Sequence, residues 1–239
     1  MTIPEHRYTA FLVGSLLTSY PDPESRQLLN QLLASPAVQA TCAALADTDW
    51  QALTARLVAV DDLVPLQADY VDLFDRSRQR NSLYETEYGA NRIFRKPREL
   101  ADLAGFYQAF GLRYNTPQTL AEMPDHVAVE LEFYALLLLK QRHLEALADQ
   151  EGIAIVIKAR ESFLADHLGR FPGALAACPE VAGHPFYGPA TRWTQALVAA
   201  ECAALAVTPE PLTIDPTQAE PESVACGACT AHPQPTAKE

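Results

Sequence analysis

Residues 124–138 read PDHVAVELEFYALLL, and the expected fold follows from this stretch. Proline is favoured in the first turn of a helix, so Pro124 or its neighbour is expected to start one. Asp125 would then lie in the first turn, where the helix dipole favours an acid. His126 and Glu130 are four residues apart, share a helical face and can pair. The apolar positions at helical spacing predict a buried face: Val127, Leu131, Tyr134 and Leu138.

The same pattern, a proline followed by apolar residues three or four positions apart, recurs along the chain. It predicts helices that begin near Pro23, Pro65, Pro97 and Pro189. Gly111 is expected at the end of the helix that follows Pro97, because glycine readily adopts the left-handed conformation found there. Further helices are expected at residues 5–19, 36–46, 48–60 and 152–171.

Composition agrees with a helical protein. Only ten of the 239 residues are glycine, and no segment shows sustained alternation of apolar and polar residues. We therefore predict an all-α fold, a single helical-bundle domain of about eight to nine helices, over residues 1–206. From Val207 onward the chain is rich in proline and poor in apolar residues, so residues 207–239 are expected to form a flexible tail.

Charge and targeting signals narrow the class of protein. The net charge is −12, which disfavours non-specific binding to nucleic acid or to an anionic membrane. The first residues lack a basic region followed by a continuous apolar run, and the apolar run 133–139 is too short to span a bilayer. Five cysteines without an export signal indicate a reducing compartment, so a cytoplasmic protein is expected.

Motifs for catalysis are absent from the sequence. It contains no glycine-rich dinucleotide or phosphate loop, no G-x-S-x-G and no H-E-x-x-H. His126 with Glu130 could be half of a metal site or an acid–base pair, but spacing alone favours a contact that only stabilises the start of a helix. No cofactor and no catalytic residue are predicted.

The end of the chain carries Cys226, Cys229 and His232. Three soft ligands at this spacing can hold zinc or an iron–sulfur cluster, and two close thiols can form a redox pair. A structural zinc site needs a fourth ligand, which the tail does not offer. The alternative is a tail whose thiols have no role in the fold. Cys42, Cys178 and Cys202 are expected to be small buried residues.

Residues 76–98 form a basic stretch within this acidic chain. They hold seven Arg or Lys and two Glu, a net charge of +5, which leaves −17 for the rest of the chain. Two interpretations remain open. The arginines pair with acidic helix faces nearby, or they form a contact surface for an anionic group or partner.

Three segments together resemble the TorD/DmsD/NarJ family of redox enzyme maturation chaperones, which serve molybdenum oxidoreductases. The stretch 124–138 resembles the signature helix of that family. Residues 69–74, DYVDLF, resemble its Y-x-x-L-F helix end, and residues 82–88, SLYETEY, resemble the loop that follows. The loop lacks the prolines and the tryptophan common in some branches, and it is closest to the nitrate reductase and type II enzyme branch.

The resemblance implies a cytoplasmic chaperone and not an enzyme. Such a chaperone binds the cofactor-free catalytic subunit of a molybdopterin oxidoreductase, often at its twin-arginine signal peptide, and assists insertion of the molybdenum cofactor. It is a monomer or a domain-swapped dimer. The rival hypothesis is a metal- or thiol-dependent redox protein that acts through Cys226, Cys229 and His232. The resemblance implies client-peptide binding at Asp125 and His126, and it places Tyr84, Glu85 and Tyr88 in the loop beside them. With Pro124 and Glu130 of the same stretch, these residues make up the predicted client-binding site.

Overall fold

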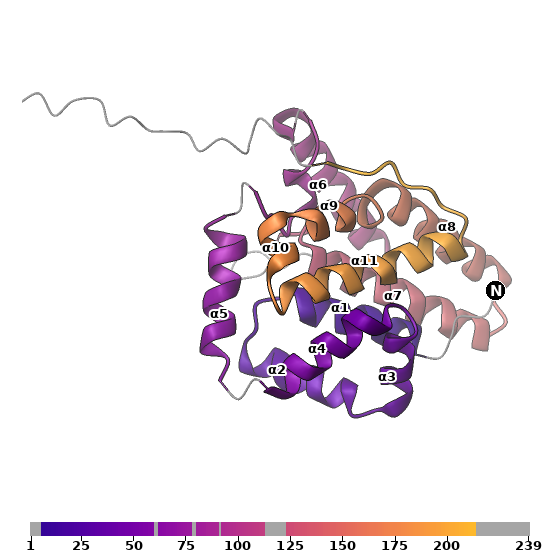
Figure 1. Cartoon of the computed structure of the whole chain (residues 1–239). Helices are drawn as coiled ribbons and strands as arrows, with labels where there is room; N and C mark the ends of the chain where they lie inside the picture. Colours follow the sequence, from indigo (N-terminus) through magenta and orange to yellow (C-terminus); the bar gives the residue numbers. More distant parts are fainter. Residues whose placement is uncertain (1–5, 60–61, 78–79, 91, 113–122, 214–239) are drawn as a thin grey trace, which may run out of the picture.

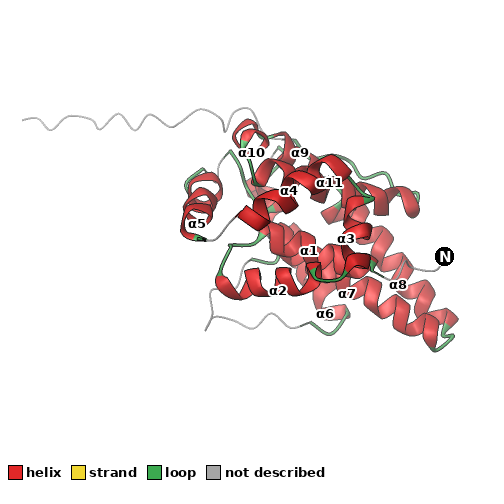
Figure 2. Cartoon of the chain, turned by 60° about the horizontal axis from the view of Figure 1, so that its bottom comes forward, coloured by secondary structure: helices red, strands yellow, loops and turns green. Residues whose placement is uncertain are grey.

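The computed structural model describes residues 6–59, 62–77, 80–90, 92–112 and 123–213. Within these residues every regular element is a helix, which confirms the all-α prediction (Figure 2). Eleven α-helices are present there: α1 (Arg7–Thr18), α2 (Pro23–Leu33), α3 (Pro36–Ala43), α4 (Asp47–Ala59), α5 (Val64–Tyr70), α6 (Arg92–Ala109), α7 (Val127–Ala146), α8 (Gln150–Phe163), α9 (Pro172–Ala177), α10 (Pro179–Gly183) and α11 (Tyr187–Ala204).

Short irregular helical turns extend several of these helices. Val71–Asp75 continues α5 as a π-helical turn, Leu164–Leu168 continues α8 in the same way, and Glu85–Glu87 forms a 3₁₀ turn before α6. The count exceeds the predicted eight to nine helices because α9 and α10 were not predicted. Each begins at a proline but is too short to show an apolar period.

The core lies where α1, α7 and α11 meet, and α11 crosses in front of the other two in Figure 1. Gly14 of α1 sits at this junction, facing Leu131 of α7 and Leu197 and Trp193 of α11. All three of these side chains are fully buried. The absence of a side chain at Gly14 lets the three helices approach closely. Among the described helices, none is both long and apolar enough to cross a membrane.

The start of α6 differs from the prediction that Pro97 begins this helix. The helix begins at Arg92 and Pro97 lies inside it. Proline removes one backbone hydrogen bond from the helix, and Pro97 removes it close to the N-terminal end of α6. Ion pairs of Arg95 with Glu99 and of Lys96 with Glu87 support this first part of the helix. At the other end, Gly111 has a φ of +85°, as its predicted position after the helix requires.

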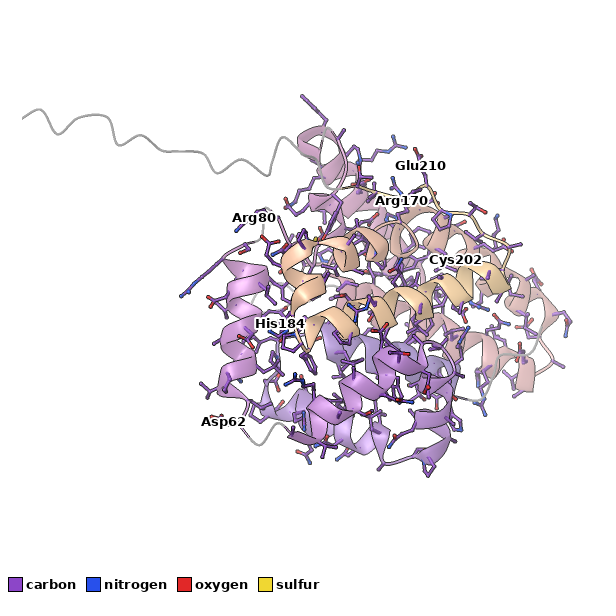
Figure 3. The ribbon with its side chains drawn as sticks, in the orientation of Figure 1. Asp62, Arg80, Arg170, His184, Cys202 and Glu210 are labelled. Carbon is purple, nitrogen blue, oxygen red and sulfur yellow. The ribbon has the colours of Figure 1, made fainter. Side chains whose placement is uncertain are left out.

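The chain after α11 does not leave the domain at residue 206. Leu212 is buried, its backbone N–H donates to the carbonyl of Arg170, and the N–H of Gly89 donates to the carbonyl of Thr213. Arg170 also donates to the carbonyl of Glu210, and the two residues lie close together in Figure 3. The first residues of the expected tail therefore pack on the domain, because Leu212 anchors them.

Candidate functional site

The segment of residues 82–88, called here the covering segment, lies against the entry to α7. Tyr84 and His126 form an antiparallel bridge. The N–H of Val127 donates to the carbonyl of Leu83, and the N–H of Glu85 donates to the carbonyl of Asp125, each at 2.8 Å. Two of the segments that resemble the chaperone family are thus in direct contact, although about forty residues separate them in the sequence.

Side chains strengthen this contact. The hydroxyl of Thr86 donates to Asp125 Oδ2 at 2.5 Å, and the hydroxyl of Tyr107 in α6 donates to the carbonyl of Pro124 at 2.6 Å. The hydroxyl of Tyr88 donates to the carbonyl of Ser82 at 2.6 Å, which closes the covering segment on itself. The entry to α7 is therefore held from two sides.

His126 is the N-cap of α7, and its Nδ1 accepts the backbone N–H of Ala128 at 3.1 Å. An accepting Nδ1 carries no proton, so Nε2 carries the proton of the neutral ring and faces the hydroxyl of Tyr70 at 3.4 Å. The prediction that Asp125 lies in the first turn of the helix is wrong, since the helix begins at Val127. The backbone before it is extended because it pairs with the covering segment.

Glu130 does not pair with His126, contrary to the prediction from their spacing. The capping role turns the imidazole away, and both carboxylate oxygens of Glu130 lack a hydrogen-bond partner. Burial raises the pKa of Glu130 well above its ordinary value, and the neighbouring carboxylates of Glu85, Asp125 and Glu99 raise it further. Both effects favour the neutral form of Glu130. We call Glu85, Glu99, Asp125 and Glu130 the carboxylate cluster.

Two cations border the carboxylate cluster. His167 Nδ1 lies 3.0 Å from Glu85 Oε2, and its Nε2 lies 3.2 Å from Asp102 Oδ2. Arg170 Nη1 lies 3.8 Å from a Glu85 oxygen and 3.6 Å from a Glu99 oxygen. Burial lowers the pKa of His167, but the hydrogen bonds and the charges of Glu85 and Asp102 outweigh burial and raise it overall. His167, in the turn after α8, thus joins the covering segment to α6.

The structure brings together the predicted residues Tyr84, Glu85, Asp125, His126 and Glu130, but it does not expose them. Glu85, His126 and Glu130 are 0% exposed, and Asp125 is 1% exposed. In this conformation the carboxylates of Asp125 and Glu130 therefore lie out of contact with solvent.

The two remaining predicted residues, Tyr88 and Pro124, lie in the same region. Tyr88 is buried at the end of the covering segment, and Pro124 is half-buried at the entry to α7. Sequence reasoning missed Asp102, Tyr107, His167 and Arg170. They carry no motif of their own, and only tertiary packing brings them to the site.

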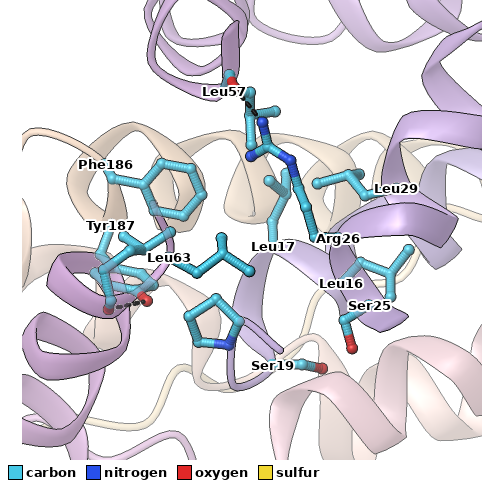
Figure 4. A pocket seen from close by; sticks show the side chains of 12 residues that line it. Leu16, Leu17, Ser19, Ser25, Arg26, Leu29, Leu57, Leu63, Phe186 and Tyr187 are labelled. Atoms are coloured by element: carbon cyan, nitrogen blue, oxygen red, sulfur yellow. Dashed lines mark hydrogen bonds between the residues drawn. The ribbon is translucent and has the colours of Figure 1, made fainter. Parts of the chain in front are cut away.

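A small apolar cavity lies elsewhere, among α1, α2, α4, α5 and α11 (Figure 4). Leucine side chains, Phe186 and Tyr187 line it, and Arg26 closes one side by donating to the carbonyl of Leu57. Its volume of about 20 Å³ is room for roughly one water molecule. This cavity is too small to be the groove that a bound apolar helix would need.

Four of the seven cations in the basic stretch 76–98 form ion pairs. Its cations pair as follows: Arg76 with Asp72, Arg80 with Glu180, Arg95 with Glu99, and Lys96 with Glu87. The first interpretation, pairing with acidic groups nearby, therefore accounts for these four cations. No free basic surface needs to be invoked for them.

The predicted metal or thiol site at Cys226, Cys229 and His232 lies outside the described residues. Over the part of the chain that the structure describes, no group of three or more His, Cys, Asp or Glu side chains is arranged to hold a metal ion. The three described cysteines, Cys42, Cys178 and Cys202, are free thiols and buried, as predicted.

Comparison with known proteins supports the resemblance. Residues 34–177 match the family described as nitrate reductase delta subunit, and this range includes the covering segment, the start of α7 and His167. The chain belongs to the nitrate reductase delta subunit family. This membership confirms the family resemblance of the sequence motifs. The matched range covers more than half of the chain. It contains all the residues of the candidate site named above.

Two individual proteins are similar to this family member. A chlorate reductase assembly chaperone protein from Ideonella dechloratans is 30% identical over 169 residues, which cover 69% of this chain and 72% of that protein. A crystal structure of a protein from Archaeoglobus fulgidus assigned as a redox enzyme maturation protein is 18% identical. The structural alignment covers 83% of this chain and 97% of the Archaeoglobus fulgidus chain, with a TM-score of 0.42.

Replacing Glu130 with glutamine is expected to weaken the pH dependence of stability. The pKa of Glu130 in the folded chain lies above its unfolded value of about 4.3. The wild type therefore loses stability as the pH rises from about 4.3 through the folded pKa, whereas glutamine cannot ionise. The variant should match the wild type near pH 4 and exceed it at about pH 8. Urea unfolding across this range measures the difference, and two parallel curves would contradict it.

Proposed function

We propose that this chain is a cytoplasmic assembly chaperone that binds the cofactor-free catalytic subunit of a molybdenum oxidoreductase. The observation that carries the proposal is the family match over residues 34–177, which spans the whole candidate site. The 30% identity to a chlorate reductase assembly chaperone supports it, because that protein's name also describes an assembly chaperone. In this proposal the chain has no catalytic role of its own and assists insertion of the molybdenum cofactor before export.

The client site in this proposal consists of the covering segment and the entry to α7. Its residues are those that resemble the family motifs: Tyr84, Glu85, Tyr88, Pro124, Asp125, His126 and Glu130. Because several of them are fully buried, client binding requires the covering segment to move. A site of this kind is closed in the free protein and opens when the client binds.

The proposed client segment is a twin-arginine signal peptide. Such a peptide is basic at one end and apolar in its middle. A chain with a net charge of −12 attracts the basic end and raises the rate of encounter. The apolar part would bind in a groove between helices that the movement of the covering segment uncovers.

Substituting Asp125 with asparagine is expected to weaken client binding by about tenfold, or roughly 1.4 kcal/mol. Asparagine keeps an oxygen that can accept the hydrogen bond from Thr86, so the fold is retained while the negative charge is lost. Calorimetric titration with the client signal peptide measures the affinity. Asp49→Asn is the matched control, because Asp49 pairs with Arg192 far from the covering segment. Equal affinities of wild type and Asp125→Asn would contradict the site.

Deleting the gene tests the function in the cell. The proposal expects the client oxidoreductase to accumulate with little molybdenum cofactor, measured as molybdenum per purified enzyme. Supplying the gene on a plasmid should restore the cofactor content. An unchanged molybdenum content in the deletion strain would overturn the proposal.

A further inference from the structure

The chain after α11 continues as a strap that crosses two other parts of the domain. Residues 207–213, called here the C-terminal strap, run from the end of α11 over the turn after α8 and reach the residue that follows the covering segment (Figure 1). Two glycines lie against it. A Cβ placed on Gly169 would lie 2.5 Å from Pro209 Cγ, and one placed on Gly89 would lie 3.2 Å from Leu212 Cδ2. The strap therefore packs closely on both glycines.

Three hydrogen bonds and one buried side chain hold the C-terminal strap. The N–H of Leu212 donates to the carbonyl of Arg170 at 2.9 Å. The N–H of Gly89 donates to the carbonyl of Thr213 at 2.8 Å, and Arg170 Nε donates to the carbonyl of Glu210 at 3.3 Å. Leu212 is 7% exposed, whereas Glu210 and Thr213 are exposed. Leu212 is therefore the anchor of the strap.

Both partners of the strap are joined to the covering segment. Gly89 directly follows Tyr88, the last residue of that segment. Arg170 Nη1 lies 3.8 Å from an oxygen of Glu85, within the segment, and 3.6 Å from an oxygen of Glu99 in α6. The strap thus acts on the end of the covering segment through Gly89 and on its middle through Arg170.

The covering segment is also held firmly by contacts of its own. Lys96 pairs with Glu87 at 2.5 Å, His167 pairs with Glu85 at 3.0 Å, and Glu85 is fully buried. Opening breaks these contacts, so the closed form dominates in the free chain. Contacts of the strap that exist only in the closed form shift the balance further towards it.

We propose that the C-terminal strap is an autoinhibitory lock on the covering segment, held in place by Leu212. While Leu212 is buried, the strap fixes Gly89 and Arg170 and stabilises the closed form. The coupling between the strap and the covering segment does not depend on the identity of the client. The regulatory role rests on the proposed chaperone function, in which the client binds the open form.

The lock controls the affinity for the client through the population of the open form. A ligand that binds only this form has its affinity reduced by the fraction of molecules that are open. Release of the strap removes contacts of the closed form and raises that fraction. A chain whose strap is released should therefore bind the client more tightly, although no residue of the client site has changed.

The first test follows backbone hydrogen exchange in the full-length variant Leu212→Asp. A carboxylate is costly to bury, so this variant should release the strap. The Gly89 amide, which donates to Thr213, reports release, and the Glu85 amide, which donates to Asp125, reports opening of the covering segment. We expect exchange at both amides to accelerate about tenfold, with the helices retained by circular dichroism. Leu212→Ala should give a smaller change in the same direction.

Thr213→Asp is the matched control, because it adds the same charge at the next position, where the side chain is exposed. The backbone carbonyl of Thr213, which accepts from Gly89, is kept in this variant. Exchange at Gly89 and Glu85 should therefore keep its wild-type rate. Faster exchange at Gly89 in Leu212→Asp without a change at Glu85, or no change at either amide, would overturn the inference.

The second test titrates the wild type and Leu212→Asp with a synthetic twin-arginine signal peptide by calorimetry. We expect the variant to bind this peptide about tenfold more tightly. Equal affinities would overturn the autoinhibitory role. Binding to neither protein, together with coupled exchange at Gly89 and Glu85, would instead refute the proposed signal-peptide client and leave the coupling of strap and covering segment established.

Discussion

Replacing Glu201 with alanine is expected to lower the free energy of unfolding by about 3–5 kcal/mol. Glu201 is buried in α11 and accepts hydrogen bonds from Arg7, Tyr134 and Arg160, at 2.5, 2.9 and 2.6 Å. These partners come from α1, α7 and α8, so one carboxylate joins four helices. Removing it leaves Arg160, only 2% exposed, with its charge uncompensated.

Urea unfolding followed by circular dichroism measures this loss. Asp49→Ala is the control, because it breaks the more exposed pair with Arg192 and should cost less than about 1 kcal/mol. The combined variant Arg160→Met with Glu201→Leu should recover part of the loss, since it removes both buried charges together. A single Glu201→Ala variant as stable as the control would show that the network contributes little.

Replacing Trp193 with alanine is also expected to cost about 3–5 kcal/mol. The indole is fully buried, lies 5.3 Å from the ring of Trp50 and donates to the carbonyl of Cys42 at 2.9 Å. Alanine would leave a cavity between α4 and α11. The carbonyl of Cys42 would keep only the longer bond from the N–H of Leu45, at 3.3 Å. Trp193→Phe keeps much of the apolar contact and should cost less.

Circular dichroism is the suitable probe for these variants, because the substitution removes one of only two tryptophans and changes the fluorescence itself. The expected order of unfolding midpoints is wild type, then phenylalanine, then alanine. An alanine variant with the wild-type midpoint would mean that the contact of α11 with α3 and α4 does not stabilise the domain.

The helices could be predicted from the sequence where apolar periods were long and a proline marked the start. The segments 23–33 and 36–43 begin at prolines whose preceding Asp22 and Ser35 cap them, so local sequence and structure agree. The prediction failed at α6 and α7, because ion pairs or a contacting segment moved the first residue of the helix. Such contacts join residues that are distant in the chain and leave no local pattern.

The candidate site was predicted in part. The motifs placed residues 82–88 beside the stretch that begins at Pro124, and the structure has these two segments in contact. The burial of Glu85, Asp125 and Glu130 could not be read from the motifs. Glu99 of α6 adds its charge to the surroundings of Glu130, and His167 and Arg170 beyond α8 contact Glu85 and Glu99. No spacing within the two motifs contains that information.

The most direct measurement of the chaperone proposal compares two forms of the client. The purified chain is titrated with the catalytic subunit of the molybdenum oxidoreductase, once without its cofactor and once fully loaded. The proposed function predicts a stable complex with the cofactor-free subunit and much weaker binding of the loaded one. Equal binding of both forms, or binding of neither, would contradict it.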